Sequence, residues 1–262
     1  MKPRRINAVI LRHLYEVRHN GNHLSNIIYW PIVNIVVWGF FTIYLRRGDH
    51  LQPGLINCLL GAVILWGLFN GFQRDMAVGL LDELWSRNLV NLFASPLSVS
   101  EYVTGLIAVN LVKAMTGLLA GGLIAWFFYH YNIFPTFPVL APFILNLALF
   151  ALSVGIAVTG LIFRYTTRVQ TMAWSVAGLL MPLSCVFYPL KSLPIFLQGA
   201  AWAVPTSHSF EGMRQAIELG TFSTSHFEWG LELNLVYFIL AGLFFRRMFE
   251  SARARGLLVK VD

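Results

Sequence analysis

Charged residues are scarce in this chain. Of its 262 residues, only 12% are charged and 57% are hydrophobic, whereas a soluble domain carries roughly 25% charged residues. A soluble chain would also distribute its apolar residues at a helical or strand period, but here they form long blocks without charge. The composition therefore excludes an ordinary water-soluble domain and indicates an integral membrane protein.

Cysteines and metal-binding patterns are lacking too. The chain has 2 cysteines, Cys58 and Cys185, and both lie inside apolar segments, where they are typical of small hydrophobic residues rather than of a disulfide or a zinc site. His13, His19 and His23 are close in sequence, but no acid or cysteine completes a site with them. We therefore predict no bound metal.

The excess of basic over acidic residues, 19 against 12, does not indicate nucleic-acid binding. A nucleic-acid-binding module would gather its basic residues on one soluble face, whereas here they lie at the ends of the apolar blocks. That placement is typical of cytoplasmic loops that face anionic lipid head groups.

The apolar blocks predict an all-α membrane protein with six transmembrane helices. A hydrocarbon core of about 30 Å requires roughly 20 helical residues. The predicted spans are Ile27–Leu45, Gly54–Phe72, Tyr102–Tyr129, Pro138–Phe163, Val169–Tyr188 and Trp229–Phe245. Because no repeat or long linker divides the chain, residues 1–262 are expected to form a single transmembrane domain.

The basic residues also predict the orientation of the chain. With six spans, one side holds both termini and most of the Lys and Arg residues, from Lys2 to Lys260. The other side holds only Arg46, Arg47, Lys191 and Arg214. Since cytoplasmic loops carry the basic excess, both termini are expected in the cytoplasm. No cleavage site follows a short apolar core, so we expect the N-terminus to be retained.

Two segments outside the spans are amphipathic. In residues 1–23, apolar side chains lie on one helical face and charged ones on the other, which predicts a helix in the cytoplasmic interface. Residues 73–101 contain a predicted helix, Leu81–Asn91, with an apolar stripe and a polar face. The stripe is formed by Leu81, Leu84, Trp85, Leu89 and Leu92, and the polar face by Asp82, Glu83, Ser86 and Arg87. Either this helix docks a soluble partner or it is an ordinary connector.

The segment that follows is expected to start with a capped helix. Ser98 and Glu101 fit a capping box, and Leu97 with Tyr102 fits a hydrophobic staple at the beginning of the third span.

Residues 189–228, between the fifth and sixth spans, are too apolar for a free loop, and each arm is too short to cross a bilayer. We predict that this outward segment dips into the membrane and returns.

These features together resemble the type 2 ATP-binding-cassette (ABC) permeases, which export polysaccharides, lipids and drugs from bacteria. The resemblance is carried by the basic amphipathic N-terminal helix, the sequence Ala94-Ser95-Pro96-Leu97-Ser98 with an acid three residues later, and the outward motifs. Those motifs are Phe187-Tyr188-Pro189, Leu193-Pro194, Val204-Pro205 and Phe210-Glu211-Gly212-Met213-Arg214.

The resemblance implies a dimer of permeases on two soluble ABC ATPase subunits. It makes Leu81–Asn91 the coupling helix, with contacts to the ATPase from Leu81, Asp82, Glu83, Leu84, Trp85 and Arg87. The chain contains no Gly-Lys-Ser/Thr sequence and so lacks a Walker A phosphate loop. ATP and Mg²⁺ are therefore expected to bind the partner subunit, and this chain is not expected to be an enzyme.

Two residues within the spans are candidates for the substrate path. Lys113 lies near the middle of the third span, where an ammonium is costly, so it either holds an anionic head group or is paired within the protein. Trp38 lies deep in the first span and either lines a route for a sugar or a hydrophobic drug, or simply packs between helices.

The sequence thus favours the permease of an exporter that moves an amphiphilic substrate, such as a lipid-linked glycan, a lipid or a drug, by alternating access. One alternative is a membrane-embedded enzyme that uses His208 and Glu211 of the outward segment as acid and base. A second alternative is a passive scaffold or pore. Association with an ATPase distinguishes the first hypothesis from both others.

Overall fold

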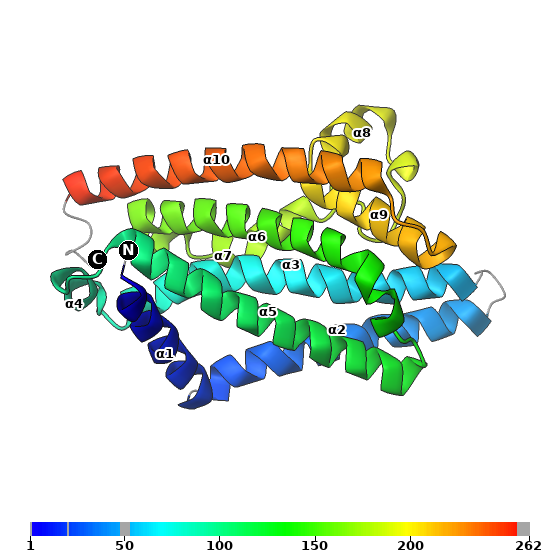
Figure 1. Ribbon diagram of the computed structural model, residues 1–262, viewed down its shortest axis with the longest axis horizontal. Coiled ribbons are helices and arrows are strands. Elements are labelled where there is room, and N and C mark those ends of the chain that lie inside the picture. The colour runs from blue at the N-terminus through cyan, green and yellow to red at the C-terminus, as the bar shows by residue number, and fades with distance from the viewer. Residues whose placement is uncertain (1, 20, 48–52, 256–262) are drawn as a thin grey trace.

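A computed structural model describes residues 2–19, 21–47 and 53–255, and all regular structure within these ranges is helical. The long helices lie side by side along one axis, which is horizontal in Figure 1. They are α2 (Gly21–Arg47), α3 (Pro53–Trp85), α5 (Val99–Tyr129), α6 (Phe137–Tyr165) and α10 (Thr224–Ala254). The shorter helices are α1 (Pro3–His19), α4 (Leu89–Ala94), α7 (Met172–Leu180), α8 (Ile195–Trp202) and α9 (Pro205–Leu219).

Four helices in the described part of the chain are long and apolar enough to cross a membrane. They are Gly54–Trp85, Val99–Tyr129, Phe134–Val169 and Thr224–Ala254, and α2 adds the shorter apolar stretch Tyr29–Tyr44. The four long helices confirm the second, third, fourth and sixth predicted spans. Three of the basic residues that predict the orientation lie outside the described side chains: Arg46, Arg47 and Lys260.

The prediction of an uninterrupted fifth span at residues 169–188 is wrong. Only Met172–Leu180 form a regular α-helix, α7, and its 9 residues cover roughly 14 Å at about 1.5 Å per residue, half of a bilayer core. Pro182 lacks an amide proton and cannot continue the helical hydrogen bonds. Turns follow, with Cys185 in the left-handed region at φ 52°. The segment is apolar throughout, so composition alone did not reveal the break.

The second predicted span ends later than expected. Charge at Arg74 and Asp75 suggested an end at Phe72, but α3 continues to Trp85. Its extension is stabilised by apolar side chains that are fully buried, among them Met76, Leu80 and Leu81. Charged residues are compatible with a helix, and burial of one face decides where this helix ends.

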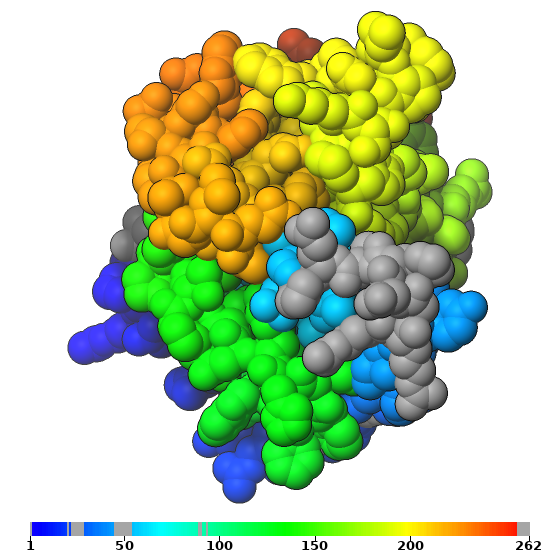
Figure 2. Space-filling view, turned by 90° about the vertical axis from the view of Figure 1, so that its right-hand side faces the viewer, coloured from blue at the N-terminus to red at the C-terminus, as the bar shows by residue number. Residues whose placement is uncertain are grey.

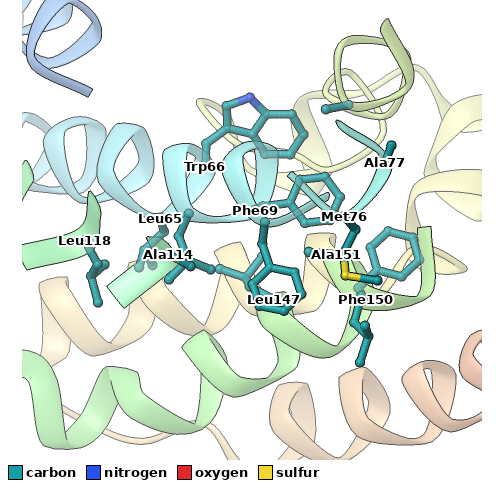
Figure 3. Packing of buried hydrophobic residues seen from close by; sticks show 14 of the residues in the cluster. Leu65, Trp66, Phe69, Met76, Ala77, Ala114, Leu118, Leu147, Phe150 and Ala151 are labelled. Carbon is teal, nitrogen blue, oxygen red and sulfur yellow. The ribbon is translucent and has the colours of Figure 1, made fainter. Parts of the chain in front are cut away.

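The core lies where α3 passes between α5 and α6, and α10 packs along the other side of α6. Aromatic rings fill it: Phe69 stacks on Trp66 with centroids 4.9 Å apart and on Phe150 at 5.7 Å. Figure 3 shows these rings beside Met76 and Leu147. Because these side chains come from several helices, the core fixes the arrangement of the central spans.

The beginning of α1 and the end of α10 lie at the same end of the bundle (Figure 1). In Figure 1, α1, α4 and the last turns of α10 lie at the left, while α8 and α9 lie at the right. Figure 2 looks onto that right-hand end, where the yellow and orange residues of the outward segment gather on one side and the green residues of α5 and α6 on the other. The predicted cytoplasmic elements therefore share one end, and the predicted outward segment lies at the opposite end.

Candidate functional site

The predicted coupling helix Leu81–Asn91 is not one helix in the structure. Its first half is the end of α3, and its second half begins the short helix α4, with a turn between them. The turn is a Schellman motif: the Asn88 amide donates to the Glu83 carbonyl at 2.9 Å and the Arg87 amide to that of Leu84 at 3.1 Å. Arg87 takes the left-handed position of this motif at φ 54°. Sequence periodicity missed the turn because the apolar stripe continues across it.

The residues predicted to contact an ATPase divide into an inner and an outer set. Leu81 and Glu83 are 0% exposed and Leu84 is 2% exposed. Asp82 is half-buried, whereas Arg87 is exposed and Trp85 is 50% exposed. The expectation that Glu83 shares an outward polar face with Arg87 is therefore not met in the isolated chain, where Glu83 points inward.

Glu83 is held by the N-terminal helix. The Arg12 Nη2 atom of α1 lies 2.7 Å from Glu83 Oε1 and donates to Oε2 at 2.9 Å. Asn88, just after the turn, donates a further hydrogen bond to Oε2 at 2.7 Å. A carboxylate that is buried needs such partners to remain charged. Glu83 thus joins α1, the end of α3 and the beginning of α4.

A second buried carboxylate joins α1 to the beginning of α5. Glu101 is 2% exposed and completes the predicted capping box with Ser98, whose amide donates to Glu101 Oε2 at 3.0 Å. The Lys2 amide donates to Glu101 Oε1 at 2.7 Å, and Arg5 Nη1 lies 3.5 Å from Oε2. The two acids mark both ends of the segment between α3 and α5, and α1 contacts both.

Packing between α1 and α5 is close. A Cβ atom added at Gly105 would lie 2.6 Å from the Val9 Cγ1 atom, so only glycine permits this approach. His13 of α1 is also buried, 3.4 Å from Glu16, and burial lowers the pKa of its imidazole. The amphipathic N-terminal helix therefore packs as a fixed part of the bundle.

A cavity of about 340 Å³ lies between α2, α3, α5 and α7. Lys113 and Trp38, the two residues predicted for the substrate path, both line it, although they come from different helices. The ring of Trp38 stacks on that of Phe187, with centroids 4.2 Å apart. The Arg74–Asp75 ion pair, 3.1 Å between Nε and Oδ1, also lines the cavity.

An aromatic contact connects this cavity to the predicted coupling residues. Trp174 of α7 lines the cavity, and its ring lies nearly parallel to that of Trp85 with centroids 6.5 Å apart. Trp85 ends α3, directly before the turn at Arg87. A displacement of the turn therefore has a short route to α7.

His208 and Glu211, the predicted acid and base of the enzyme alternative, both contact neighbouring parts of the outward segment and α10. The Glu211 carboxylate accepts a hydrogen bond from the Leu190 amide at 2.6 Å and lies 3.1 Å from Arg214 Nη2. One imidazole nitrogen of His208 lies 2.9 Å from the Trp202 carbonyl oxygen and the other 3.4 Å from His226. These contacts tie α9 to η3 (Leu190–Ser192), α8 and α10.

The family of the chain follows from comparison with known proteins. Residues 22–217 match the family described as ABC-2 type transporter, the membrane domain of ABC transporters. The chain belongs to this family. No curated protein matches it. The match runs from the beginning of α2 into α9, so it covers three-quarters of the chain, including the predicted coupling segment and the cavity-lining helices.

The ABC-2 match confirms the resemblance and the main functional class. The chain is a multi-pass membrane permease of an ABC-2 type transporter. ABC-2 permeases lack an ATPase site of their own and typically pair with an ABC ATPase subunit, which binds the nucleotide.

Sequence reasoning missed part of the cavity wall. The charges of Arg74 and Asp75 predict the end of a span rather than a cavity wall, and Trp174 lies in an apolar run that carries no signal of a site. The spacing of glycines in the sequence does indicate the cavity wall. In two helices, a pair of glycines four residues apart lies on one helix face: Gly67 and Gly71 in α3, and Gly117 and Gly121 in α5.

Proposed function

We propose that this chain is the membrane half of an ATP-driven exporter in the bacterial inner membrane. Two copies form a homodimer on two ABC ATPase subunits, with both termini in the cytoplasm. The homodimer alternates access and carries an amphiphilic substrate, such as a lipid-linked glycan, a lipid or a drug. The observation that carries this proposal is the ABC-2 match over residues 22–217.

The turn between α3 and α4 is the proposed docking site for the ATPase. Trp85, Asp82 and Arg87 supply the contacts, since Trp85 and Arg87 are exposed at the end of the bundle that holds α1 and the end of α10. The turn is held in position by the buried side chains of Leu81, Glu83 and Leu84, which thereby support the docking site without contacting the ATPase through an exposed face. Exposed tryptophans and arginines are the residue types that most often anchor protein interfaces.

The proposed route of coupling leads from the turn to the cavity. Movement of Trp85 displaces Trp174 and hence α7, one wall of the cavity that Lys113 and Trp38 also line. The cavity combines apolar aromatic faces with the ammonium of Lys113, which supports a substrate that has both a polar and an apolar part.

Affinity purification of the chain from its native membranes tests this function. The expected result is copurification of an ABC ATPase in a complex that contains two copies of the permease. Trp85→Ala is expected to weaken the complex by about 2 kcal/mol, roughly thirtyfold in affinity. Purification of a folded permease without any ATPase would favour the scaffold, pore or enzyme alternatives.

A further inference from the structure

We propose that the cavity between α2, α3, α5 and α7 is a binding site for the head group of an anionic, phosphate-bearing amphiphile. The head group lies beside Lys113, and its apolar part lies against the tryptophan rings. This inference rests on the proposed function and deepens it, because it gives the chemical class of the substrate. It is carried by three features of the cavity wall: its glycines, its charge and its aromatic rings.

At four of the five glycines of the cavity wall, helix packing does not require the absence of a side chain. A Cβ atom added at Gly67, Gly71, Gly117 or Gly178 would meet nothing within 4 Å, although all four line the cavity. By contrast, a Cβ atom at Gly121 would lie 3.0 Å from Ile35, so that glycine permits the approach of α2. Glycine in a helix costs about 1 kcal/mol relative to alanine. The four open glycines therefore keep space free in the cavity, at a cost to the helices.

The charge of the wall favours an anion. Arg74 and Asp75 neutralise each other at 3.1 Å, and within the described part of the chain no carboxylate lies within 4.0 Å of the Lys113 ammonium. Lys113 is half-buried in the middle of α5. An unpaired ammonium at that depth is costly. A phosphate group supplies the missing counter-charge and accepts strong hydrogen bonds from an ammonium.

The size and the rings of the cavity favour one end of an amphiphile. Its volume of about 340 Å³ is at the lower end of the range of small-molecule sites, about 300–1,000 Å³, which suits a head group with a short apolar part. Trp38, Trp66 and Trp174 offer flat apolar surfaces around the polar centre. Alkyl chains of such a ligand remain in the surrounding membrane.

The test is equilibrium binding of radiolabelled dodecyl phosphate to the purified, full-length permease in dodecyl maltoside, without ATPase or nucleotide. Omitting the ATPase separates this site from coupling: binding without ATPase assembly contradicts the proposed function alone, and assembly without binding contradicts the site alone. Saturable binding is expected. Phosphatidylglycerol and inorganic phosphate are then added as competitors for the bound dodecyl phosphate, and phosphatidylcholine is the zwitterionic control.

Two variants and a matched control locate the site. Lys113→Met is expected to weaken binding about tenfold or more, because it removes the cation but keeps the length of the side chain. Gly117→Leu is expected to abolish binding by filling the cavity. Gly242→Leu is the control, since a Cβ atom there also meets nothing within 4 Å but Gly242 of α10 is not part of the cavity wall. It is expected to bind as the original chain does.

The competition identifies the source of the phosphate group. Displacement by phosphatidylglycerol would indicate that a bilayer phospholipid can occupy the site, displacement by inorganic phosphate would indicate that the head group alone suffices, and displacement by neither would indicate a single-chain substrate. All three support an anionic site. The proposal is overturned if dodecyl phosphate does not bind, if phosphatidylcholine displaces it equally well, or if folded Lys113→Met and Gly117→Leu bind it like the original chain.

Discussion

Single residues at the turn after α3 combine backbone strain with exposure. Arg87 is in the left-handed region at φ 54°, where a residue with a Cβ atom is destabilised by roughly 1–2 kcal/mol. Glycine is the usual residue at this position of a Schellman motif. An exposed arginine at this strained position supports the proposed contact with the ATPase.

Arg87→Gly is expected to separate folding from docking. The variant should be as stable as the original chain or more stable by up to about 1 kcal/mol, because it relieves the left-handed strain. It should nevertheless bind the ATPase more weakly, because it loses the guanidinium. Thermal unfolding in detergent and pull-down of the ATPase measure the two effects. A stabilised variant that retains full affinity would remove Arg87 from the docking surface.

The sequence predicts which residues have unusual chemistry better than it predicts where their side chains lie. Lys113 stood out because a charge in mid-membrane is costly, and it does line a cavity together with Trp38. The inward position of Glu83 was not predictable in the same way, since its partner Arg12 is 71 residues away in the chain. Helical periodicity reports faces, but it does not report which long-range partner lies on each face.

At the scale of elements, α1 holds both ends of the predicted coupling segment. It contacts Glu83 at the end of α3 and Glu101 at the beginning of α5, through Arg12 at 2.7 Å and Arg5 at 3.5 Å. The element predicted to lie on the membrane surface therefore also fixes both ends of the segment that is proposed to dock the ATPase.

Arg12→Gln is expected to destabilise the permease by about 1–3 kcal/mol, because a buried acceptor, Glu83, loses its main donor. Arg18→Gln is the matched control, since Arg18 lies on an exposed part of the same helix. Thermal unfolding in detergent is the measurement. In a double-mutant cycle, Arg12→Gln and Glu83→Gln should show a coupling energy, whereas additive effects would mean that the pair does not act as a unit.

The outward segment gives a second prediction at this scale. Phe196 of α8 is 80% exposed and Thr224, at the start of α10, is exposed as well, so protein contacts shield neither side chain. If α8 dips into the membrane, a water-soluble thiol reagent should label Thr224→Cys much faster than Phe196→Cys in membranes, and at similar rates in a short-chain detergent. Equal rates in membranes would indicate a water-exposed segment.

Elements with strong local signals were predictable, and breaks within apolar runs were not. The capping box at Ser98 and Glu101 was read from the sequence and is present. The interruption after Leu180 and the continuation of α3 to Trp85 depend on Pro182 and on burial against neighbouring helices. Hydropathy averages over a window and is insensitive to both.

At the scale of the whole molecule, the arrangement separates the proposed sites along the bundle. In Figure 1, α1, α4 and the end of α10 lie at one end, and α8 and α9 lie at the other. The long cavity-lining helices α2, α3 and α5 run along the bundle between these ends. In the proposed mechanism, a change at the ATPase is transmitted to the cavity through the contact between the rings of Trp85 and Trp174.

The most direct test of ATP coupling is the rate of ATP hydrolysis by the copurified ATPase. This rate is measured with lipid vesicles that contain the permease and with vesicles that lack it. We expect the permease to change the hydrolysis rate, and the double variant Trp85→Ala with Arg87→Gly to leave it close to that of the ATPase alone. Insertion of the variant into the vesicles is verified separately. A hydrolysis rate that is the same with and without the unaltered permease would contradict its function as the membrane half of an ATP-driven exporter.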